Sequence, residues 1–410
     1  MGHTRLTILD LTDLAHQPLV TEDGQGVLVY NGEVYNYPAL RAELASEGVE
    51  VKSTGDSEVV LKALHHWGPE ATIPRLDGMF AFAYLDRRGE CDTLWLARDR
   101  VGIKSLAVAE VGDELVFASE VKSLLRHPRV PRRPDRQILS WMMFQRVLES
   151  RHTTFEGIRG LRPGTWWRVD AHGKEERSYF RPVDAVDVDR LVAAGERDPR
   201  SYLDELRQTL QESVRLHLAS DVPLATMCSG GVDSSLITAY AKDERPDLHA
   251  YVSEMDWADS EGDQAVRVGN HLGVPVHRVH LGKEEFLRMW PQIVWSGDRP
   301  SARPSDAALL SVTRRCRRDG VKVLLTGEGA DELLGGYPWQ RHTYRMWRAL
   351  RWPRRLFRTP ERARRERRQL ELGPLSSMLG RGDALALRHL MFALDAEAET
   401  RPLHILERLD

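Results

Sequence analysis

The chain has few cysteines, no long apolar segment and almost no net charge. Its 410 residues include only Cys91, Cys228 and Cys316, with no CxxC pair, which excludes a disulfide framework and a structural zinc site of the usual spacing. No apolar run approaches the ~18 residues that cross a bilayer. A net charge of −3 provides no general attraction for nucleic acid or an anionic membrane. We therefore expect a cytoplasmic protein that binds small molecules, with neither nucleic acid nor membrane as a partner.

The sequence pattern changes near residues 183–200. Before them, short β-branched and aromatic runs surround two segments, 38–48 and 57–67, whose apolar residues are three or four apart, which predicts helices on a mostly antiparallel sheet. Residues 183–200 are polar and lack such a pattern, as is typical of a linker. After them, strands alternate with helices, as in a parallel sheet. The prediction is a domain over 1–182, a linker over 183–200 and a second domain over 201–410.

A glycine-rich turn, Ser229-Gly-Gly-Val-Asp-Ser-Ser235, follows the predicted strand 222–228 and leads into the predicted helix 234–242. Glycines leave backbone N–H groups free to face an anion, and the start of a helix favours phosphate. Asp233 supplies a carboxylate of the kind that a magnesium–phosphate complex requires. The turn is not a Walker A loop, because GxxxxGK[ST] is absent. A purely structural turn would explain the glycines alone, so the serines and the aspartate favour a phosphate-binding turn.

A second glycine-rich turn, Leu325-Thr-Gly-Glu-Gly-Ala-Asp-Glu-Leu-Leu-Gly-Gly-Tyr337, follows the predicted strand 321–326. Because the carboxyl ends of parallel strands meet at one edge of a sheet, we expect both turns to flank one crevice. The remainder, 337–410, has a helical pattern and contains an Arg-dense stretch from Arg341 to Arg368. Aromatic and leucine residues are interleaved with these arginines, so a solvated helix face explains the stretch better than an RNA-binding patch.

Both turns carry signatures of one family. The first resembles the PP-loop, SGGxDSS, of the ATP pyrophosphatases. The second is similar to the (S/T)GEGADExxGGY signature of class B, glutamine-hydrolysing asparagine synthetases. The resemblance implies that the second half is an α/β PP-loop ATP pyrophosphatase domain, also described as adenine nucleotide alpha-hydrolase-like. It further implies ATP as a substrate, with Mg²⁺ as the accompanying ion.

The N-terminal half is similar to the same family. The blocks that resemble its glutaminase domain are 2–10, 30–36, 53–58, 77–82 and 97–104. The resemblance implies an α+β Ntn-hydrolase-like glutaminase domain (glutamine amidotransferase type 2), which binds glutamine through Arg5, Asn31, Gly32, Glu33 and Asp56. Arg5 would pair with the glutamine carboxylate, and the two acids with its α-ammonium. Asn31-Gly32 is also a strong hairpin signal, so a turn at this point is the alternative.

The family resemblance implies a two-step amidation. Aspartate attacks the α-phosphorus of ATP to form β-aspartyl-AMP and pyrophosphate, and ammonia then displaces AMP. Matched residue by residue, Asp233 and Asp331 would bind Mg²⁺, and Glu328 would orient or deprotonate the ammonia. The predicted contacts to ATP and pyrophosphate are Cys228, Ser229, Gly230, Gly231, Asp233, Ser234, Ser235, Ser253, Thr326 and Gly327. A homodimer is expected by analogy with the family.

The sequence departs from the family pattern at both ends. In the family, an N-terminal cysteine hydrolyses glutamine with its own α-amine as base, and no cysteine of this chain is N-terminal. A C-terminal lysine followed by a Glu-x-Arg-x-Pro-Phe block is also missing. We therefore expect an incomplete glutaminase domain and a C-terminally incomplete synthetase domain, as in a fragment or a misassigned gene. A shortened paralogue that uses ammonia, or is catalytically silent, is the alternative.

Two arginines leave the identity of the substrate open. The segment Asp298-Arg-Pro-Ser-Ala-Arg-Pro-Ser305 stands where the family usually has Asp-Glu-Pro-Phe-Ala-Asp-Pro-Ser, so Arg299 and Arg303 replace acids. One alternative function is therefore a PP-loop amide-forming enzyme of a natural-product pathway, with another carboxylate and amine. An inactive nucleotide-binding fragment is the other.

Cys316 lies in a sequence rich in arginine. The neighbouring guanidinium groups would lower the pKa of its thiol and make it reactive. A position on a solvated helix face is the simpler interpretation.

Overall fold

The computed structural model describes residues 1–145, 148, 150–185, 187, 198–256, 261–301, 303–337 and 340. The chain divides into two compact units. The first comprises Met1–Pro134 with Glu149–Thr326, and the second comprises Asp135–Leu148 with Gly327–Asp410. Residues 186 and 188–197 of the predicted linker lie outside the described residues, and so does the Arg-dense stretch from 341 onward.

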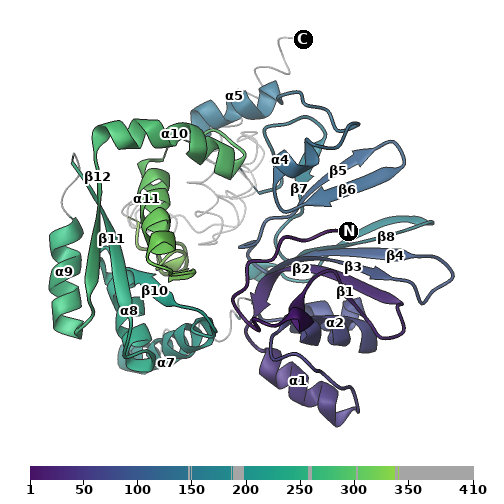
Figure 1. The fold of residues 1–410 in the computed structure, drawn as a ribbon, viewed down its shortest axis with the longest axis horizontal. Helices are drawn as coiled ribbons and strands as arrows, with labels where there is room; N and C mark the ends of the chain where they lie inside the picture. Colours follow the sequence, from purple (N-terminus) through teal and green to yellow (C-terminus); the bar gives the residue numbers. More distant parts are fainter. Residues whose placement is uncertain are drawn as a thin grey trace, which may run out of the picture. The chain divides into compact units, whose positions relative to one another are not determined.

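The N-terminal part of the first unit contains two antiparallel sheets (Figure 1). The six-stranded sheet has the order β1 (Leu19–Val20), β2 (Gly26–Val34), β3 (Gly78–Asp86), β4 (Thr93–Arg98), β8 (Thr165–Asp170) and β9 (Gly173–Ser178). The three-stranded sheet has the order β6 (Glu114–Ala118), β5 (Ala107–Val111) and β7 (Ile158–Gly160). The predicted antiparallel arrangement is confirmed.

The alternation of side chains along β3 explains why the larger sheet is buried on both faces. Successive residues of a strand point to opposite faces. Phe80, Phe82 and Tyr84 share one buried cluster with residues of α1 (Tyr37–Ser46) and α2 (Ser57–His66). Ala81 and Ala83 belong to another cluster, with Leu106 and with Val108 of β5. The helices therefore cover one face, and the smaller sheet packs on the other (Figure 1).

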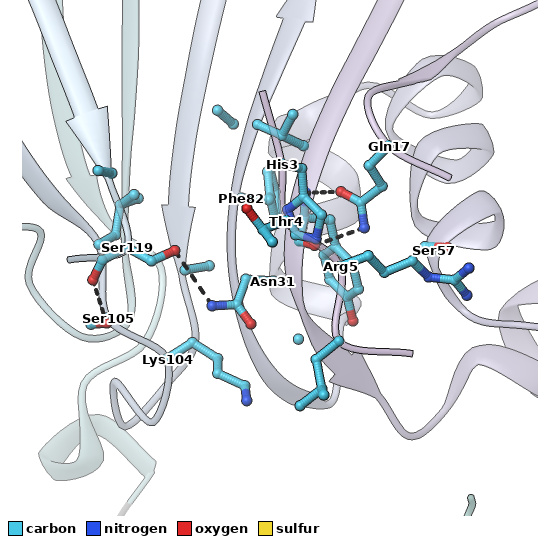
Figure 2. Close-up of a pocket in the computed structure, with 18 of the residues that line it drawn as sticks. His3, Thr4, Arg5, Gln17, Asn31, Ser57, Phe82, Lys104, Ser105 and Ser119 are labelled. Carbon is cyan, nitrogen blue, oxygen red and sulfur yellow. Dashed lines mark hydrogen bonds between the residues drawn. The ribbon is translucent and has the colours of Figure 1, made fainter. Parts of the chain in front are cut away.

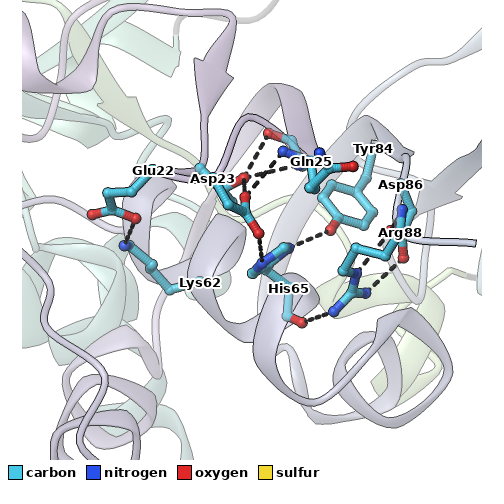
Figure 3. Close-up of polar contacts among 10 residues, drawn as sticks. Glu22, Asp23, Gln25, Lys62, His65, Tyr84, Asp86 and Arg88 are labelled. Carbon is cyan, nitrogen blue, oxygen red and sulfur yellow. Dashed lines mark hydrogen bonds and ion pairs between the residues drawn. The ribbon is translucent and has the colours of Figure 1, made fainter.

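A polar network fastens the end of α2 to the sheet (Figure 3). The His65 Nδ1 lies 3.2 Å from the Tyr84 hydroxyl, and its Nε2 lies 3.1 Å from the Asp23 carboxylate. Arg88 pairs with both carboxylate oxygens of Asp86, at 2.8 and 2.6 Å, and donates to the carbonyl oxygen of His65. These contacts join the β1–β2 turn, α2 and the end of β3, which leaves the opposite end of α2 free to border a cavity.

The C-terminal part of the first unit is built on a parallel sheet. Its order is β12 (Val276–Leu281), β11 (His249–Met255), β10 (Leu224–Met227) and β13 (Val323–Leu325), and every pair is parallel. One face packs against α7 (Pro199–His217), α8 (Val232–Glu244) and α9 (Glu261–Leu272). The other packs against α11 (Pro304–Arg318). The doubly wound arrangement predicted from the alternating strands and helices is confirmed.

One helix of this sheet region was not predicted. Helix α10 (Lys283–Gly297) contains Pro291 in its interior. A proline removes one backbone donor and usually ends a helix, so the local pattern argues against this element. The helix forms because Met289 and Ile293 pack against Leu281 and Ala307.

The interpretation of Cys316 as part of a solvated helix face is wrong. The residue is buried on α11, in a cluster with Ala225, Tyr251 and Val312. Burial raises the pKa of its thiol to about 11, so the surrounding arginines do not activate it. Cys316 is a core residue.

The second unit has two described helices, α5 (Arg136–Gln145) and α12 (Ala330–Leu334), and nothing is described beyond residue 340. Among all the helices that the structure describes, none is both long enough and apolar enough to cross a membrane.

Candidate functional site

Hydrogen bonds between Ser229 and Ser234 stabilise the conformation of the turn after β10. Cys228 is buried, and its backbone nitrogen donates to the carbonyl of Tyr251 at 2.9 Å, which continues the sheet. The hydroxyls of Ser229 and Ser234 lie 3.0 Å apart, and the Ser234 hydroxyl also accepts from the Ser229 nitrogen at 3.2 Å. Helix α8 begins at Val232, with Gly231 as its N-cap, so Ser234 lies in its first turn.

Gly230 is required at its position for two reasons. Its φ of +81° lies in the left-handed region, which side chains rarely adopt. A Cβ there would also lie 2.6 Å from Gln264 Cγ and 2.8 Å from the backbone nitrogen of Ala265. The Gln264 side chain donates to the Gly230 carbonyl at 2.7 Å. Close approach of α9 therefore fixes the shape of the turn.

The start of α8 leaves donors free for an anion. Gly231 has no side chain with which to cap the helix, so the first backbone N–H groups have no capping acceptor. The Ser235 hydroxyl is buried and has no hydrogen-bond partner in the described part of the chain. The half-buried Asp233 lies in the first turn of the helix. Unpaired donors beside one carboxylate suit a phosphate group that carries a divalent cation.

Two further predicted residues lie at the ends of neighbouring strands. Ser253 is buried on β11, and its hydroxyl lies 3.3 Å from that of Ser311 on α11. Thr326 directly follows β13, which pairs with β10, so it lies at the edge of the sheet that carries the Ser229 turn. Ser253 thus lies two residues before the end of β11, and Thr326 follows β13; both strands are adjacent to β10, as a nucleotide site at this edge requires.

The second glycine-rich turn belongs to the second unit from Gly327 onward. Gly329, with a φ of +93°, precedes the short helix α12. Asp331 is half-buried, and its carbonyl accepts the backbone nitrogens of Gly335 and Gly336 at 3.0 and 3.2 Å. Glu328 is exposed. The expectation that Glu328 and Asp331 face the first turn stays a prediction.

A cavity of about 620 Å³ opens in the N-terminal part of the first unit (Figure 2). Its lining comes from the N-terminal segment 2–9, residue 17, strands β2 and β3, and segments 56–57, 104–106 and 117–123. Arg5, Asn31, Gly32, Glu33 and Asp56, the five residues expected to bind glutamine, all line it. The structure therefore brings this predicted set together.

Two buried acids, Glu33 and Asp56, line the cavity. The Asp56 carboxylate accepts from the Tyr30 hydroxyl at 2.6 Å and from the Val34 nitrogen at 2.9 Å, and burial raises its pKa. The Glu33 Oε1 is buried without a partner among the described residues. Burial and the nearby charge of Asp56 raise the pKa of Glu33 to about 7, and Lys104 opposes this. A buried carboxyl without a partner is suited to a cationic group of a ligand.

The other three predicted residues have different surroundings. Gly32 lies in the middle of β2, where a Cβ would meet the Met79 carbonyl at 2.3 Å, so the alternative of a hairpin turn at Asn31-Gly32 is wrong. Asn31 donates to the Ser119 hydroxyl at 3.4 Å. The Arg5 guanidinium donates to backbone carbonyls of its own loop, those of Leu9, Asp10 and Thr12, and points away from Asn31 (Figure 2).

Comparison with known proteins assigns both halves. Residues 1–180 match the family model described as a glutamine amidotransferase domain, and residues 205–404 match the model described as asparagine synthase. The chain is 34% identical, over 342 residues, to asparagine synthetase [glutamine-hydrolyzing] 1 of Bacillus subtilis, covering 82% of this chain and 51% of that protein. The chain belongs to the family of glutamine-hydrolysing asparagine synthetases.

Proteins from other organisms align over a similar share of this chain. A putative asparagine synthetase [glutamine-hydrolyzing] of Mycobacterium bovis is 35% identical over 347 residues, covering 82% of this chain and 52% of that protein. Amidase chyE of Penicillium rubens is 31% identical over 356 residues, covering 82% and 51%. The chain spans about half the length of the curated relatives it matches. A solved glutamine phosphoribosylpyrophosphate amidotransferase from B. subtilis aligns at 16% identity, covering 68% of this chain and 50% of that one, with a TM-score of only 0.31.

Three lining residues were not assigned from the family motifs. Lys104 lies in the cavity and lowers the pKa of Glu33 by its charge. Ser119 accepts from Asn31, and the Gln17 side chain pairs with both backbone groups of Tyr30, at 2.9 and 2.6 Å. Lys104 ends the block 97–104 that resembles the family, so its position gave a signal. Gln17 and Ser119 lie outside the matched blocks and are recruited by folding.

Glu33→Gln is expected to stabilise the protein at pH 8 and to have little effect near pH 4. The folded Glu33 has a pKa of about 7, above the ordinary glutamic acid value of 4.5. The folded state therefore binds the extra proton between these values, and wild-type stability falls as the pH rises from 4.5 to about 7. The glutamine side chain of the variant does not titrate, so the gain above pH 7 is on the order of 3 kcal/mol.

Chemical denaturation of both proteins at several pH values measures this difference. Glu50→Gln, at an exposed position with no ion pair in the described chain, is the control and should show no such pH-dependent gain. An equal effect of Glu33→Gln at pH 4 and pH 8 would contradict the burial of an ionisable carboxyl in this cavity.

Proposed function

We propose that the protein is an ATP-dependent carbon–nitrogen ligase that converts aspartate to asparagine through β-aspartyl-AMP, releasing AMP and pyrophosphate. The observation that carries this proposal is the turn after β10. Helix α8 begins there without a side-chain cap, the buried Ser235 hydroxyl has no partner among the described residues, and Asp233 lies in the first turn of the helix. Such a turn binds the phosphates that leave as pyrophosphate. The parallel sheet below it is the scaffold expected of a PP-loop ATP pyrophosphatase.

The residues of the turn supply the nucleotide site. Ser229, Gly230, Gly231, Ser234 and Ser235 hold the pyrophosphate, and their preset donors stabilise the charge that develops on it. Adenine lies against the backbone of Cys228 and Ser253, with Thr326 and Gly327 at the border of the site. Glu328 orients or deprotonates the incoming ammonia.

Mg²⁺ fits the residues that this proposal assigns to it. Asp233 is a half-buried carboxylate that no described side chain pairs with, and hard oxygen ligands of this kind suit the ion. Asp331 would provide the second carboxylate. When bound, the ion offsets negative charge on the polyphosphate. The serines and backbone groups of the turn position the phosphates. The two carboxylates and these phosphates would then share the ion.

The cavity is the glutamine site in this proposal. The α-ammonium of glutamine pairs with Glu33 and Asp56, which explains why an uncompensated acid is kept buried there. Asn31 and Gly32 line the same cavity and complete the proposed site. Arg5 must exchange its three loop carbonyls for the glutamine carboxylate. Glutamine binding should therefore weaken as Glu33 is protonated below about pH 7, and Glu33→Gln should remove it.

Isotope exchange between ATP and pyrophosphate tests the ligase proposal. With Mg²⁺ present, aspartate should stimulate exchange, because formation of β-aspartyl-AMP is reversible and releases pyrophosphate. Supplying ammonia should then convert the intermediate to asparagine and AMP in equal amounts. Exchange that does not depend on aspartate would contradict the proposal, and so would consumption of ATP that yields ADP.

A second candidate function changes the acceptor and keeps the activation step. Arg299 and Arg303 are exposed in the connection between α10 and α11, and they introduce positive charge where the family motif has acids. Some relatives of similar identity are named amidases. In this alternative, a larger or more acidic carboxylate stimulates exchange and aspartate does not. A nucleotide-binding protein without turnover is the third reading, and sustained AMP release would exclude it.

A further inference from the structure

Two aspartates of the parallel-sheet region hold two walls of the cavity. Asp221, shortly before β10, accepts from the Asp10 nitrogen at 2.8 Å, and its own nitrogen donates to the Ile8 carbonyl at 3.1 Å. Asp298, at the end of α10, accepts from the Val121 nitrogen at 2.8 Å. We call residues 8–10 the first wall and residues 119–123 the second wall. The cavity-lining members of the walls are Ile8 and Leu9, and Ser119, Glu120 and Ser123.

The contact to the second wall is charged and largely shielded from water. Lys122 Nζ lies 3.1 Å from Asp298 Oδ1, and the two side chains are 16% and 13% exposed. Thr154 donates its hydroxyl to the Asp298 carbonyl at 3.2 Å. Lys122 Nζ also lies 3.1 Å from Glu120 Oε2 of the same wall, whose side chain is 55% exposed. Pairs that exclude water are screened little by salt, and removal of Asp298 leaves the Lys122 ammonium with only this more exposed partner. Asp298 therefore fixes the position of the second wall through side chain and backbone together.

The backbone is strained at both contacts. In the described ranges, Asp10 and Asp298 are the only residues other than glycine with a positive φ, at 50° and 53°. Such conformations are unfavourable for L-residues and persist where the surrounding contacts impose them. Strain in this part of the molecule thus lies at the two joints between the cavity walls and the parallel-sheet region.

The contact between Asp10 and Asp221 connects the cavity on one side with the nucleotide-binding turn on the other. The Asp10 carboxylate accepts from the Thr54 nitrogen at 2.8 Å, and Thr54 lies two residues before Asp56 of the cavity. On the other side, Asp221 precedes β10, which ends at the turn of Ser229. Despite burial, hydrogen bonds from Thr12, Thr54 and Gly55 hold the pKa of Asp10 at about 2, so its carboxylate stays charged and bonded.

The contact between Asp298 and the second wall connects the same two regions. Asn31 donates to Ser119 of the second wall. Asp298 begins the connection into α11, and Ser311 of that helix lies 3.3 Å from Ser253 on β11. Two separate series of contacts therefore run from the cavity to the nucleotide-binding turn and its neighbouring strand.

We propose that Asp221 and Asp298 are positioning residues that couple the cavity to the nucleotide-binding turn. A ligand that draws the two walls together alters the geometry at Asp10 and Asp298, and ATP bound at the turn alters it from the other side. Each ligand then changes the affinity of the other by the same factor, because coupling is reciprocal. The inference rests on the proposed function, since it takes glutamine as the ligand of the cavity.

Calorimetric titration of the 410-residue chain measures the coupling. The dissociation constant of Mg-ATP is determined with and without saturating glutamine, and that of glutamine with and without Mg-ATP. We expect the two ratios to be equal and at least about fivefold in wild type. Asp298→Gly removes the carboxylate and tolerates the positive φ, so its ratio should fall toward one. Lys122→Met removes the other partner of this ion pair and should also lower the ratio.

The controls separate coupling from loss of structure. Asp247→Gly, at an exposed position before β11, should keep the wild-type ratio. A purely structural role of Asp298 would lower the melting temperature and weaken both ligands singly while leaving the ratio unchanged, which overturns the inference. Equal affinities with and without the second ligand in wild type overturn it as well. Absence of any glutamine binding contradicts the assignment of the cavity, and absence of ATP binding contradicts that of the turn; either removes the basis of the coupling.

Discussion

Asp233→Asn is expected to slow aspartate-dependent exchange of pyrophosphate into ATP by about 100-fold or more, because preset electrostatic groups contribute this much to such steps. Asparagine keeps the size of the side chain and removes its charge. Asp233 lies in the first turn of α8, beside the donors that hold the phosphates, so its carboxylate is the group there that can share a cation with them. The rate is measured over a range of Mg²⁺ concentrations, and high Mg²⁺ should restore part of it.

The control for this prediction lies on the same helix. Asp243→Asn changes an exposed aspartate near the opposite end of α8 and should leave the exchange rate within about twofold of wild type, as is usual for surface substitutions. Both variants should unfold at the wild-type temperature. Wild-type exchange in Asp233→Asn would remove this residue from the proposed cation site, although the phosphate-binding role of the serines would stand.

Gly230→Ala is expected to abolish most ATP binding and to destabilise the protein. The left-handed conformation alone costs an L-residue about 1–2 kcal/mol. The added methyl group would also overlap Gln264 and the backbone of Ala265, so the turn must move away from α9. A movement that costs about 1.4 kcal/mol in the complex already weakens binding about tenfold. Calorimetric titration with Mg-ATP and thermal unfolding measure the two effects.

Gly273→Ala is the matched control for Gly230→Ala. Gly273 has a φ of +65°, but nothing lies within 4 Å of the Cβ that would be added. It therefore reports the cost of the backbone conformation without a clash. Gly273→Ala should lower stability and leave ATP affinity unchanged. Equal affinities for Mg-ATP in Gly230→Ala and Gly273→Ala would show that the geometry of the turn is not needed for binding.

Most of the predicted elements rest on short-range patterns, and these patterns succeeded where burial follows the local period. The apolar residues of α2 are three or four apart, and they all meet one cluster. Strand β9 was not predicted, because every one of its residues, Gly173–Ser178, is exposed and no alternation marks it. It is a strand because it pairs with β8. Pairing with a distant segment does not leave a local signal.

The candidate sites differ in the same respect: one is encoded by neighbouring residues, and the other depends on contacts made by folding. The turn at Ser229–Ser235 is a continuous segment, and its chemistry could be predicted from residue types at fixed offsets. The roles of Arg5 and Gly32 could not, because both depend on partners that only folding supplies. Arg5 is held by carbonyls of its own loop, and Gly32 is required by the close approach of Met79 and Phe80 on β3.

The sequence by itself determined the order of strands, turns and helices that carry the nucleotide site, together with the signatures of the family. Its local spacing suffices because the turn and the helix start are neighbours along the chain. Only the tertiary structure decided that Glu33 is buried next to Asp56, with a pKa of about 7, and that Asp10 meets Asp221 across 211 residues of sequence. Burial and charge depend on contacts between distant segments, and such contacts exist only once the sheets have formed.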